Sequence, residues 1–488
     1  MVHKHHILEE YRHEAPFWRL GEAFAIPGRS RPFLLDSALA EGRLGRWSYL
    51  GPAATQTFEA WRNPDGTARV RTGAPGLGRR LDVADPFEQL ARWWGHWRIP
   101  AAERVAHPAP FLHGAVGWIG FEAGHCLERW PDTGVDDLGL PDIHFGVHPF
   151  LLIHDNETDR TWLSAVGSGV SAEKAASLAQ EIRRFHLRRL EAWRPGPDPA
   201  AAPPSDISDA LPAPFVPQAR YLEKVRRIQA DIRDGRVFEC CLTHRFEQPF
   251  AGDPWALYAV LRRDNPAPFA GYLAHEGATV ICASPERFLR LTPDGGLETR
   301  PIKGTRPRGA DPVADARLRD DLAASEKDRA ENVMIVDLAR NDLGRVCETG
   351  SVRVAGLCEV EGYATVWQLV STVRGKLREG LDGIDAIRAS FPGGSMTGAP
   401  KIEALRMIDE LEHHVRGVYA GAFGWLGCDG ALDLNMVIRT IVAKGGRATY
   451  GTGGAVTADS DPEAEWRESL DKVRALARAV ATVNDSRT

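Results

Sequence analysis

A proline-rich segment between residues 195 and 217 constrains the fold of this chain more than any other feature. It holds eight prolines together with alanine, serine and aspartate, and it has almost no apolar periodicity. Such a segment cannot bury enough apolar surface to fold alone. We therefore expect an exposed linker at 193–217 that separates an N-terminal domain, 1–192, from a C-terminal domain, 218–482.

Strands and helices are expected on both sides of this linker, but they do not alternate one for one. The N-terminal part has short apolar runs such as 149–154 and ends in a clear helix at 172–192. In the C-terminal part we expect strands at 278–291, 420–427, 432–443 and 448–454, and helices at 219–234, 313–343, 400–411 and 461–482. This order favours an α+β fold over a doubly wound parallel sheet.

The bulk composition excludes several classes of protein. The 488 residues, 43% of them hydrophobic and 26% charged, are ordinary for a soluble globular protein. A net charge of −6 argues against a nucleic-acid-binding surface. No apolar run approaches the ~18 residues of a membrane span, and the N-terminus lacks the apolar core of a signal peptide. Seven cysteines without zinc spacing fit reduced thiols, so we expect a cytoplasmic protein with no nucleic-acid and no membrane partner.

Lys303 is the first candidate for chemistry. It lies between an isoleucine and a glycine, after a stretch that reads as two strands, 279–288 and 297–300, joined by a turn. With little bulk beside it, the lysine could be pressed against a small ligand. Desolvation would then lower its pKa and expose a neutral amine, which is a good nucleophile. Glu286, in the first of these strands, could be the matching acid, although most lysines in such a turn are solvated.

Two expected helices each offer paired carboxylates on one face. They are Asp328 and Glu331 on the first helix, and Glu465 and Glu468 on the second. The first helix should begin at Ser325 with a capping box, and the second at residues 460–462 with cap residues and a proline. Carboxylates from two helices can bind Mg²⁺. They could equally be solvated faces, with Glu468 paired to Lys472.

Two glycine-rich turns, 393–401 and 451–454, could cradle an anion. Their free backbone N–H groups, and the helix that follows the first turn, favour a negative group. Neither turn matches a Walker A loop or a dinucleotide-binding pattern. Tight turns that need glycine would explain both equally well.

Five ordered blocks of sequence resemble the chorismate-utilising enzymes, which include anthranilate, aminodeoxychorismate, isochorismate and salicylate synthases. The blocks are SPERF at 284–288, PIKGTR at 301–306, ENVMIVDLARND at 331–342, FPGGSMTGAPK at 391–401 and GTGGAVTADS at 451–460. The similarity runs from about 221 to 476 and implies a large β-sandwich core flanked by helices, to which both halves of the chain contribute. Within the family, lysine at position 303 is typical of aminodeoxychorismate synthases, whereas anthranilate synthases typically carry alanine.

The resemblance assigns roles to individual residues. Lys303 and Glu286 would be the catalytic nucleophile and acid. Glu331 and Glu468 would bind Mg²⁺ directly, and Asp328 and Glu465 would lie nearby or act through water. The implied substrate-binding residues are Gly304, Thr305, Tyr419, Arg439, Gly453, Gly454 and Lys472. Of the two cations among them, arginine suits bidentate carboxylate binding and lysine acts as a point charge.

The activity implied is conversion of chorismate and ammonia to 4-amino-4-deoxychorismate. Lys303 would attack C2 while Glu286, with a raised pKa, protonates the departing C4 hydroxyl. Ammonia would then add at C4 and expel the lysine. The chain has no Gly-x-Cys-x-Gly glutaminase turn, and the Cys240-Cys241 pair lies in a strand-like run. A separate glutamine amidotransferase subunit is therefore expected as a partner.

Three alternatives remain. Anthranilate synthase component I is opposed by Lys303 and by Gln368, which stands where many relatives have a histidine and cannot shuttle protons near neutral pH. An isochorismate or salicylate synthase is opposed because no lysine lies near Thr243 and His244, where the resemblance places the water-activating lysine. A catalytically silent, aromatic-amino-acid-binding partner of a glutaminase has no reason to keep both catalytic residues and both direct metal ligands.

A possible tryptophan site is suggested by three segments, 34–37, 46–49 and 265–269, that resemble the regulatory pocket of the family. The residues concerned are Asp36, Ser37, Ser48, Asn265 and Pro266. Ala267 stands where feedback-regulated anthranilate synthases usually have serine. We therefore expect at most a structural or vestigial tryptophan site, and a packed interface between domains is an equal alternative.

Overall fold

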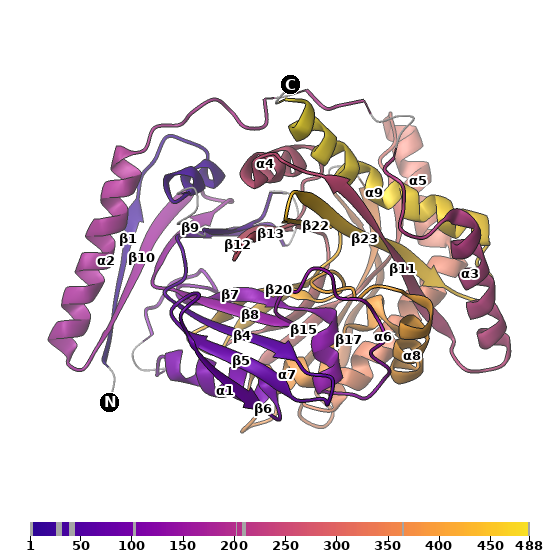
Figure 1. The fold of residues 1–488 in the computed structure, drawn as a ribbon, viewed down its shortest axis with the longest axis horizontal. Helices are drawn as coiled ribbons and strands as arrows, with labels where there is room; N and C mark the ends of the chain where they lie inside the picture. The colour runs from indigo at the N-terminus through magenta and orange to yellow at the C-terminus, as the bar shows by residue number, and fades with distance from the viewer. Residues whose placement is uncertain are drawn as a thin grey trace.

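Two large antiparallel sheets form the core of the protein, seen in a computed structural model that describes residues 3–25, 32–38, 44–100, 104–201, 203–206, 211–363 and 366–486 (Figure 1). The 11-stranded sheet runs in the order β1 (His3–Tyr11), β10 (Arg160–Gly169), β9 (Phe150–Asp155), β3 (Trp47–Gly51), β2 (Phe33–Asp36), β12 (Phe269–His275), β13 (Ala278–Ser284), β22 (Thr440–Lys444), β23 (Arg447–Val456), β11 (Glu239–Pro249) and β19 (Gly398–Ala399). The 12-stranded sheet runs β16 (Ile302–Pro307), β18 (Val366–Lys376), β15 (Gly296–Arg300), β14 (Arg287–Leu291), β21 (Leu432–Met436), β20 (Ala422–Gly427), β7 (Gly114–Ile119), β8 (Ile143–His148), β4 (Gln56–Arg62), β5 (Ala68–Gly73) and β6 (Arg79–Val83), and β17 (Arg353–Gly362) pairs with β18.

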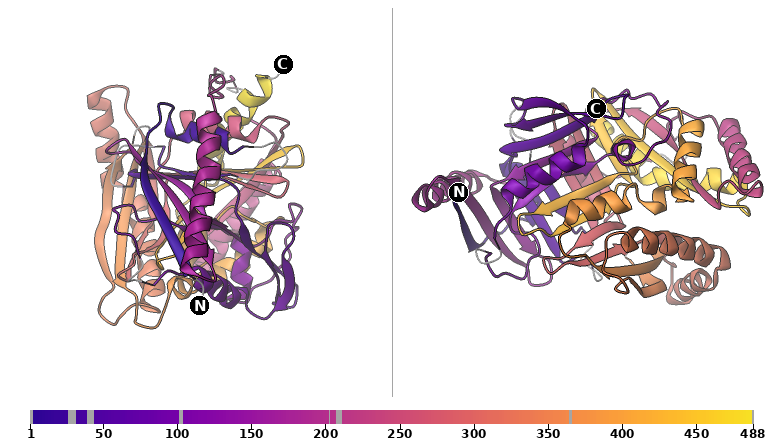
Figure 2. Two further views of the ribbon diagram at one scale, coloured as in Figure 1. Left: turned by 90° about the vertical axis from the view of Figure 1, so that its left-hand side faces the viewer. Right: turned by 90° about the horizontal axis from the view of Figure 1, so that it is seen from below.

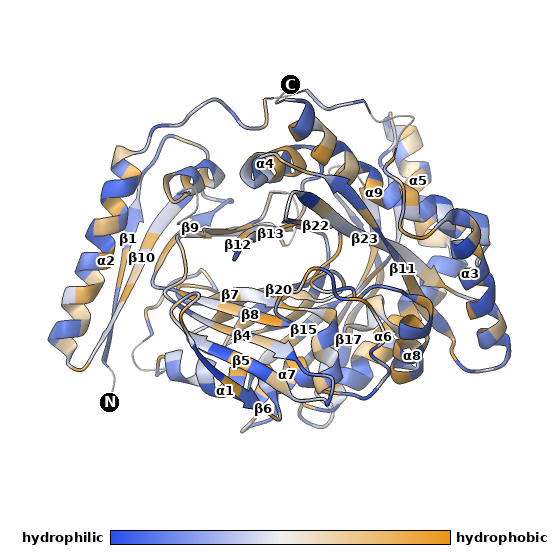
Figure 3. Ribbon diagram, viewed as in Figure 1, coloured by the Kyte–Doolittle hydropathy of each residue, from blue (hydrophilic) through white to orange (hydrophobic). Residues whose placement is uncertain are grey.

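Helices pack against both sheets. They are α1 (Pro86–Trp97), α2 (Ala172–Ala192), α3 (Gln218–Arg233), α4 (Pro254–Asp264), α5 (Pro312–Ala324), α6 (Glu326–Gly344), α7 (Gly383–Ser390), α8 (Lys401–Leu411) and α9 (Pro462–Asp485), with short 3₁₀ turns at Phe17–Ala23, Phe121–Cys126 and Gly394–Met396. Helix α2 packs along β1 and β10 (Figure 2). Hydrophilic and hydrophobic residues alternate around it (Figure 3), and Ala175, Ala179 and Leu190 face the sheet. The α+β class and the two-sheet core flanked by helices are confirmed.

Both sheets contain strands from the two sides of the proline-rich linker. β2 pairs with β12, and β7 lies between β8 and β20. The linker passes over the molecule from α2 to α3 (Figure 1), and within its described residues it contains no helix or strand. This strand pairing joins the two parts of the chain into shared sheets. The division into domains at 193–217 stays a prediction.

Three expected elements are corrected by the structure. The helix expected at 313–343 is two helices, α5 and α6, because Ser325 ends one and caps the other; the helix start expected at Ser325 is confirmed. The expected strands at 278–291 and 432–443 each divide in two, with one part in each sheet. At the first break Pro285 has no N–H to donate, and at the second Arg439 has a φ of 50°. An unbroken apolar run does not reveal that the chain crosses between sheets at these points.

The remaining expected helices are confirmed as α2, α3, α8 and α9. All seven cysteines are free thiols. None of the helices in the described part of the chain is long and apolar enough to span a membrane.

Candidate active site

Lys303 lies on the edge strand β16, where an irregularity in the pairing with β18 separates Ile302 from Thr305. Gly304 supports this irregularity with a φ of 80°. A Cβ on Gly304 would come within 2.8 Å of the Asp328 Cγ atom on α6, so the close packing requires glycine. The side chain of Lys303 is 10% exposed and reaches toward the other sheet.

Glu239, at the start of β11, forms an ion pair with the Lys303 ammonium and accepts a hydrogen bond from it. Lys303 Nζ lies 2.7 Å from Glu239 Oε1, and the Glu239 side chain is 0% exposed. Burial acts to lower the pKa of Lys303, but the carboxylates of Glu239 and Glu331 outweigh it and raise that pKa above its ordinary value. The expectation of a lowered lysine pKa is therefore wrong for the ligand-free protein, because no local pattern reveals the carboxylate of Glu239, which comes from a distant strand.

Glu286 occupies the point where the chain leaves β13 for β14. Its backbone N–H donates to Ser284 Oγ and its backbone oxygen accepts from the Met436 N–H, so both sheets hold it in place. The side chain is buried, and desolvation raises its pKa to about 7. Hydrogen bonds from Ser395 and from the Ile302 backbone, together with the charge of Lys303, act in the opposite direction but are weaker. The raised pKa is the direction that the sequence analysis expects. Because Ile302 directly precedes Lys303, this backbone hydrogen bond also brings the Glu286 carboxyl group close to the lysine.

The four expected metal ligands come from two helices that face each other. Lys327 links them, since its Nζ lies 3.8 Å from Glu331 Oε1 and 3.5 Å from Glu465 Oε1. The Glu331 Oε1 atom is buried and has no hydrogen-bond partner among the described residues, and burial raises the Glu331 pKa to about 7. Unsatisfied carboxylate oxygen is the donor that Mg²⁺ prefers, so these residues fit the ion.

Asp328 and Glu468 are held by cations of the protein itself. The Asp328 carboxylate lies 3.1 Å from Arg306 Nη2, and Glu468 Oε1 lies 2.7 Å from Lys472 Nζ. Ser325 accepts the Asp328 N–H as a helix cap, but the reciprocal bond of a capping box is not formed because Asp328 turns to the arginine. No three of the four carboxylates gather within 4.8 Å of one another in the part of the chain that the structure describes.

Two cations and two glycines were expected to hold substrate carboxylates. Arg439 is half-buried, desolvation lowers its pKa, and it forms no ion pair with any described residue. Lys472 Nζ also donates to the Gly453 carbonyl at 2.9 Å. A Cβ on Gly453 would lie 2.0 Å from the Leu242 carbonyl oxygen, and one on Gly454 would lie 2.8 Å from Glu465 Oε2. A guanidinium with no ion-pair partner among the described residues is available to a carboxylate ligand.

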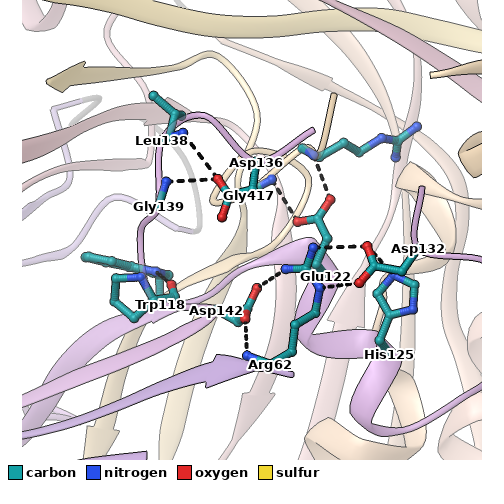
Figure 4. Close-up of polar contacts among 12 residues, drawn as sticks. Arg62, Trp118, Glu122, His125, Asp132, Asp136, Leu138, Gly139, Asp142 and Gly417 are labelled. Atoms are coloured by element: carbon teal, nitrogen blue, oxygen red, sulfur yellow. Dashed lines mark hydrogen bonds and ion pairs between the residues drawn. The ribbon is translucent and has the colours of Figure 1, made fainter. Parts of the chain in front are cut away.

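Tyr419 lines a neighbouring cavity of about 100 Å³ whose lining includes neither Lys303 nor Glu286. The turn that carries Tyr419 is fixed by Glu122, which the sequence analysis missed. The Glu122 carboxylate accepts the backbone N–H groups of Arg416 at 2.6 Å and Gly417 at 2.8 Å (Figure 4). Glu122 lies far from this turn along the chain, so no local pattern could have revealed the contact.

Gln368 lies on β18 opposite Thr305. Its side chain is 2% exposed, and its Oε1 atom has no hydrogen-bond partner among the described residues. An amide there offers a buried acceptor to a ligand, but it carries no titratable proton.

Three residues of the possible tryptophan site, Asp36, Ser37 and Ser48, are held by hydrogen bonds within the protein. Asp36 accepts hydrogen bonds from Ser48 at 3.1 Å, from the Tyr258 hydroxyl at 2.7 Å and from Arg262 at 2.5 Å. Ser37 Oγ donates to the Trp47 and Pro268 carbonyls, while Asn265 and Pro266 follow α4 directly. These contacts join the segments before and after the linker. Tryptophan binding stays a prediction.

Comparisons with known proteins agree on one family. The model of the chorismate binding enzyme family matches residues 47–478. The chain is 44% identical to an aminodeoxychorismate synthase of Streptomyces pristinaespiralis over 93% of its own length, although it spans only 63% of that relative. It is 40% identical to anthranilate synthase component 1 of Thermus thermophilus, with 92% of each protein covered.

A solved structure supports the same assignment. Anthranilate synthase component I of Streptococcus pneumoniae superposes with a TM-score of 0.75 at 29% identity, covering 90% of this chain and 93% of that one. The match to the family model extends over most of the chain and includes strands of both sheets. The chain therefore belongs to the chorismate-binding enzyme family.

Proposed function

We propose that this chain aminates chorismate to 4-amino-4-deoxychorismate, as the component I of an aminodeoxychorismate synthase. The observation that carries the proposal is a buried lysine, Lys303, with a carboxylate on one side and a protonatable acid close by. The S. pristinaespiralis relative bears the name of this activity. Since the chain spans less than two thirds of that relative, activity, substrate and partner are all proposals.

Lys303 must lose a proton before it can attack. Glu239 Oε1 already accepts from its ammonium, and the buried Oε2 atom has no hydrogen-bond partner among the described residues. Glu239 is therefore the acceptor that the structure provides for this proton. The neutral amine then attacks C2 of chorismate, and covalent capture divides a difficult substitution into two easier steps.

Glu286 supplies the proton for the departing C4 hydroxyl, which leaves as water. Because its pKa is about 7, a useful fraction of this acid is protonated near neutral pH. In the second step ammonia attacks C4, the bond from C2 to the Lys303 nitrogen breaks, and the free amine is restored. The enolpyruvyl group remains on the product.

The substrate is a dianion, and the site offers positive charge to meet it. Arg439 would bind one carboxylate through its unpaired guanidinium. Glu331 and Glu468 would hold Mg²⁺, with Asp328 and Glu465 beside them, and the bound ion would neutralise the other carboxylate. Gly453 and Gly454 would bring backbone close to the substrate, and Gly304, Thr305, Tyr419 and Lys472 would line its site.

Ammonia would come from a separate glutamine amidotransferase subunit. The name of the T. thermophilus relative, component 1, supports a division of the enzyme into subunits. None of the seven cysteines belongs to a glutaminase turn. Free ammonium salts should therefore support the reaction of this chain alone.

Product analysis tests the proposal. Purified protein is incubated with chorismate, Mg²⁺ and an ammonium salt, and the products are separated by liquid chromatography and mass spectrometry. We expect a species in which the hydroxyl is replaced by an amine and the enolpyruvyl group is retained. An added lyase should convert this species to p-aminobenzoate, which places the amine at C4.

Anthranilate synthase activity is the second candidate, and the 40% identity to the T. thermophilus protein favours it. The same assay separates the two, because the alternative releases pyruvate and fluorescent anthranilate. Those products would mean that Lys303 does not determine the position of amination. Chorismate binding without turnover would instead favour a silent partner of a glutaminase.

A further inference from the structure

Glu59, His144 and His275 converge between the two sheets, apart from the residues of the candidate active site. Their ligand-type atoms all lie within 4.8 Å of one another. Glu59 Oε1 is 2.7 Å from His275 Nε2 and 3.6 Å from His144 Nδ1. All three side chains are buried. Glu59 and His144 lie in the 12-stranded sheet, toward the edge opposite to β16, the strand of Lys303.

Strand register builds this cluster. His144 on β8 stands directly opposite Glu59 on β4, and Glu59 stands directly opposite Arg71 on β5. Directly paired residues share one face of a sheet, so these side chains form a row. His275 ends β12 in the other sheet, which lies above β4 and β8 in Figure 1. The cluster therefore ties the two sheets together.

A cavity adjoins the cluster and contains unsatisfied imidazole nitrogens. Its volume is about 270 Å³, and Glu59, His144, His148 and His275 line it. His148 is 1% exposed, and its Nε2 atom has no hydrogen-bond partner within the described ranges; the same holds for Nδ1 of His144. Buried polar atoms without a partner are uncommon in folded proteins. Such atoms on the wall of a cavity indicate that a polar ligand belongs there.

The donor set indicates which ligand. Two imidazoles and one carboxylate are typical ligands of Zn²⁺, and three protein ligands leave a fourth coordination position open, here toward the cavity. The second oxygen of Glu59 is held by Arg71 Nε at 2.5 Å, as expected for an oriented metal ligand.

We propose that Glu59, His144 and His275 bind one Zn²⁺ ion, which links the two sheets. This site is independent of the amination chemistry, because none of its ligands belongs to the candidate active site. A Zn²⁺ ion here would stabilise the native state by its binding free energy. The alternative is a metal-free network in which Arg71 and His275 alone satisfy Glu59.

Zinc titration tests the proposal. The protein is dialysed against EDTA and then titrated with Zn²⁺ in excess Mg²⁺, which occupies the carboxylates of α6 and α9. After gel filtration we expect one Zn²⁺ per chain by elemental analysis, and a raised Tm. His144→Ala and His275→Ala should each weaken Zn²⁺ binding by more than about 100-fold, the upper end of the effect of removing an outer-shell partner. His154→Ala is a matched control, since His154 is also buried but lies outside the cluster.

Co²⁺ provides a second readout that does not depend on the variants. In a site with histidine ligands and tetrahedral geometry it should give visible absorption in the wild-type protein, and added Zn²⁺ should remove this absorption. No bound Zn²⁺ in the wild type would overturn the proposal even if both variants failed to fold. Equal Zn²⁺ binding by folded wild type, His144→Ala and His275→Ala would overturn it as well.

Discussion

Lys303 carries its charge where an isolated ammonium would be strongly destabilised, and Glu239 compensates for this. The pairing joins the edge of one sheet to a strand of the other. In this pair Lys303, the proposed nucleophile, is protonated, and Glu239 is in contact as the acceptor for its proton. At this scale the proposed reaction depends on where two protons lie, one shared by Lys303 and Glu239 and one on Glu286. One variant of each glutamate tests this.

Glu239→Gln should slow amination by about 10²- to 10³-fold at pH 7, because the amide cannot accept the Lys303 proton. Burial without the neighbouring carboxylate should also lower the lysine pKa, so the rate deficit of Glu239→Gln relative to the wild type should shrink as the pH is raised. The measurement is kcat/KM against pH at a constant concentration of free ammonia. Glu247→Gln, further along the same strand and paired with Arg447 rather than with Lys303, is the control. Unchanged activity of Glu239→Gln would remove Glu239 from the mechanism.

Glu286 should give the pH profile its alkaline limb. Its pKa is raised to about 7, and the acid must be protonated to release the C4 hydroxyl, so activity should fall as the pH rises through about 7. Glu286→Gln should be at least 10²-fold slower and should lack this limb. A limb that persists in Glu286→Gln would assign it to another group.

At the scale of elements, the irregularity in β16 determines where Lys303 lies. Gly304 combines a left-handed φ of 80° with close approach of Asp328 on α6. Gly350 has a φ of 79° but nothing within 4 Å of a Cβ, so it isolates the cost of the backbone conformation. Comparing the two glycines separates packing from backbone strain.

Gly350→Ala should cost about 1 kcal/mol of unfolding free energy. Gly304→Ala should cost about 3 kcal/mol, since it adds a clash, and it should also abolish amination by displacing β16 from α6. Denaturant unfolding and the product assay measure the two effects. Equal destabilisation by both substitutions would show that the contact with Asp328 is not tight.

The sequence predicted most of the helices but not the points where strands change sheets. Helix ends carry local signals, such as Asp461 and Pro462 at the start of α9. The break at Glu286 arises because the two halves of one apolar run join different sheets. Which sheet each half joins is decided by strands that are distant in the sequence. Glu239 was missed for the same reason, because its partner lies 64 residues away along the chain.

At the scale of the whole molecule, neither sheet belongs to one half of the chain. β7 pairs with β8 on one side and with β20 on the other, so removing the N-terminal part would leave β20 with an unpaired edge. β12 would likewise lose β2. The two parts should fold and unfold together.

A fragment of residues 218–488 should therefore fail to show a cooperative thermal transition, whereas the full chain should unfold in one. Coexpression of fragments 1–200 and 211–488 should restore both the transition and activity, because the linker between them forms no strand in its described residues. Calorimetry and size-exclusion chromatography measure this. A stable, cooperatively folded 218–488 fragment would show an independent C-terminal domain.

Covalent capture of chorismate by Lys303 is the central claim, and peptide mapping tests it most directly. The protein is incubated with chorismate and Mg²⁺ in the absence of ammonia, quenched, digested and analysed by mass spectrometry. The account predicts a mass increase equal to chorismate minus water on the peptide that contains Lys303, lost when ammonium is added. An unmodified Lys303 in a preparation that nevertheless forms aminated product would contradict it.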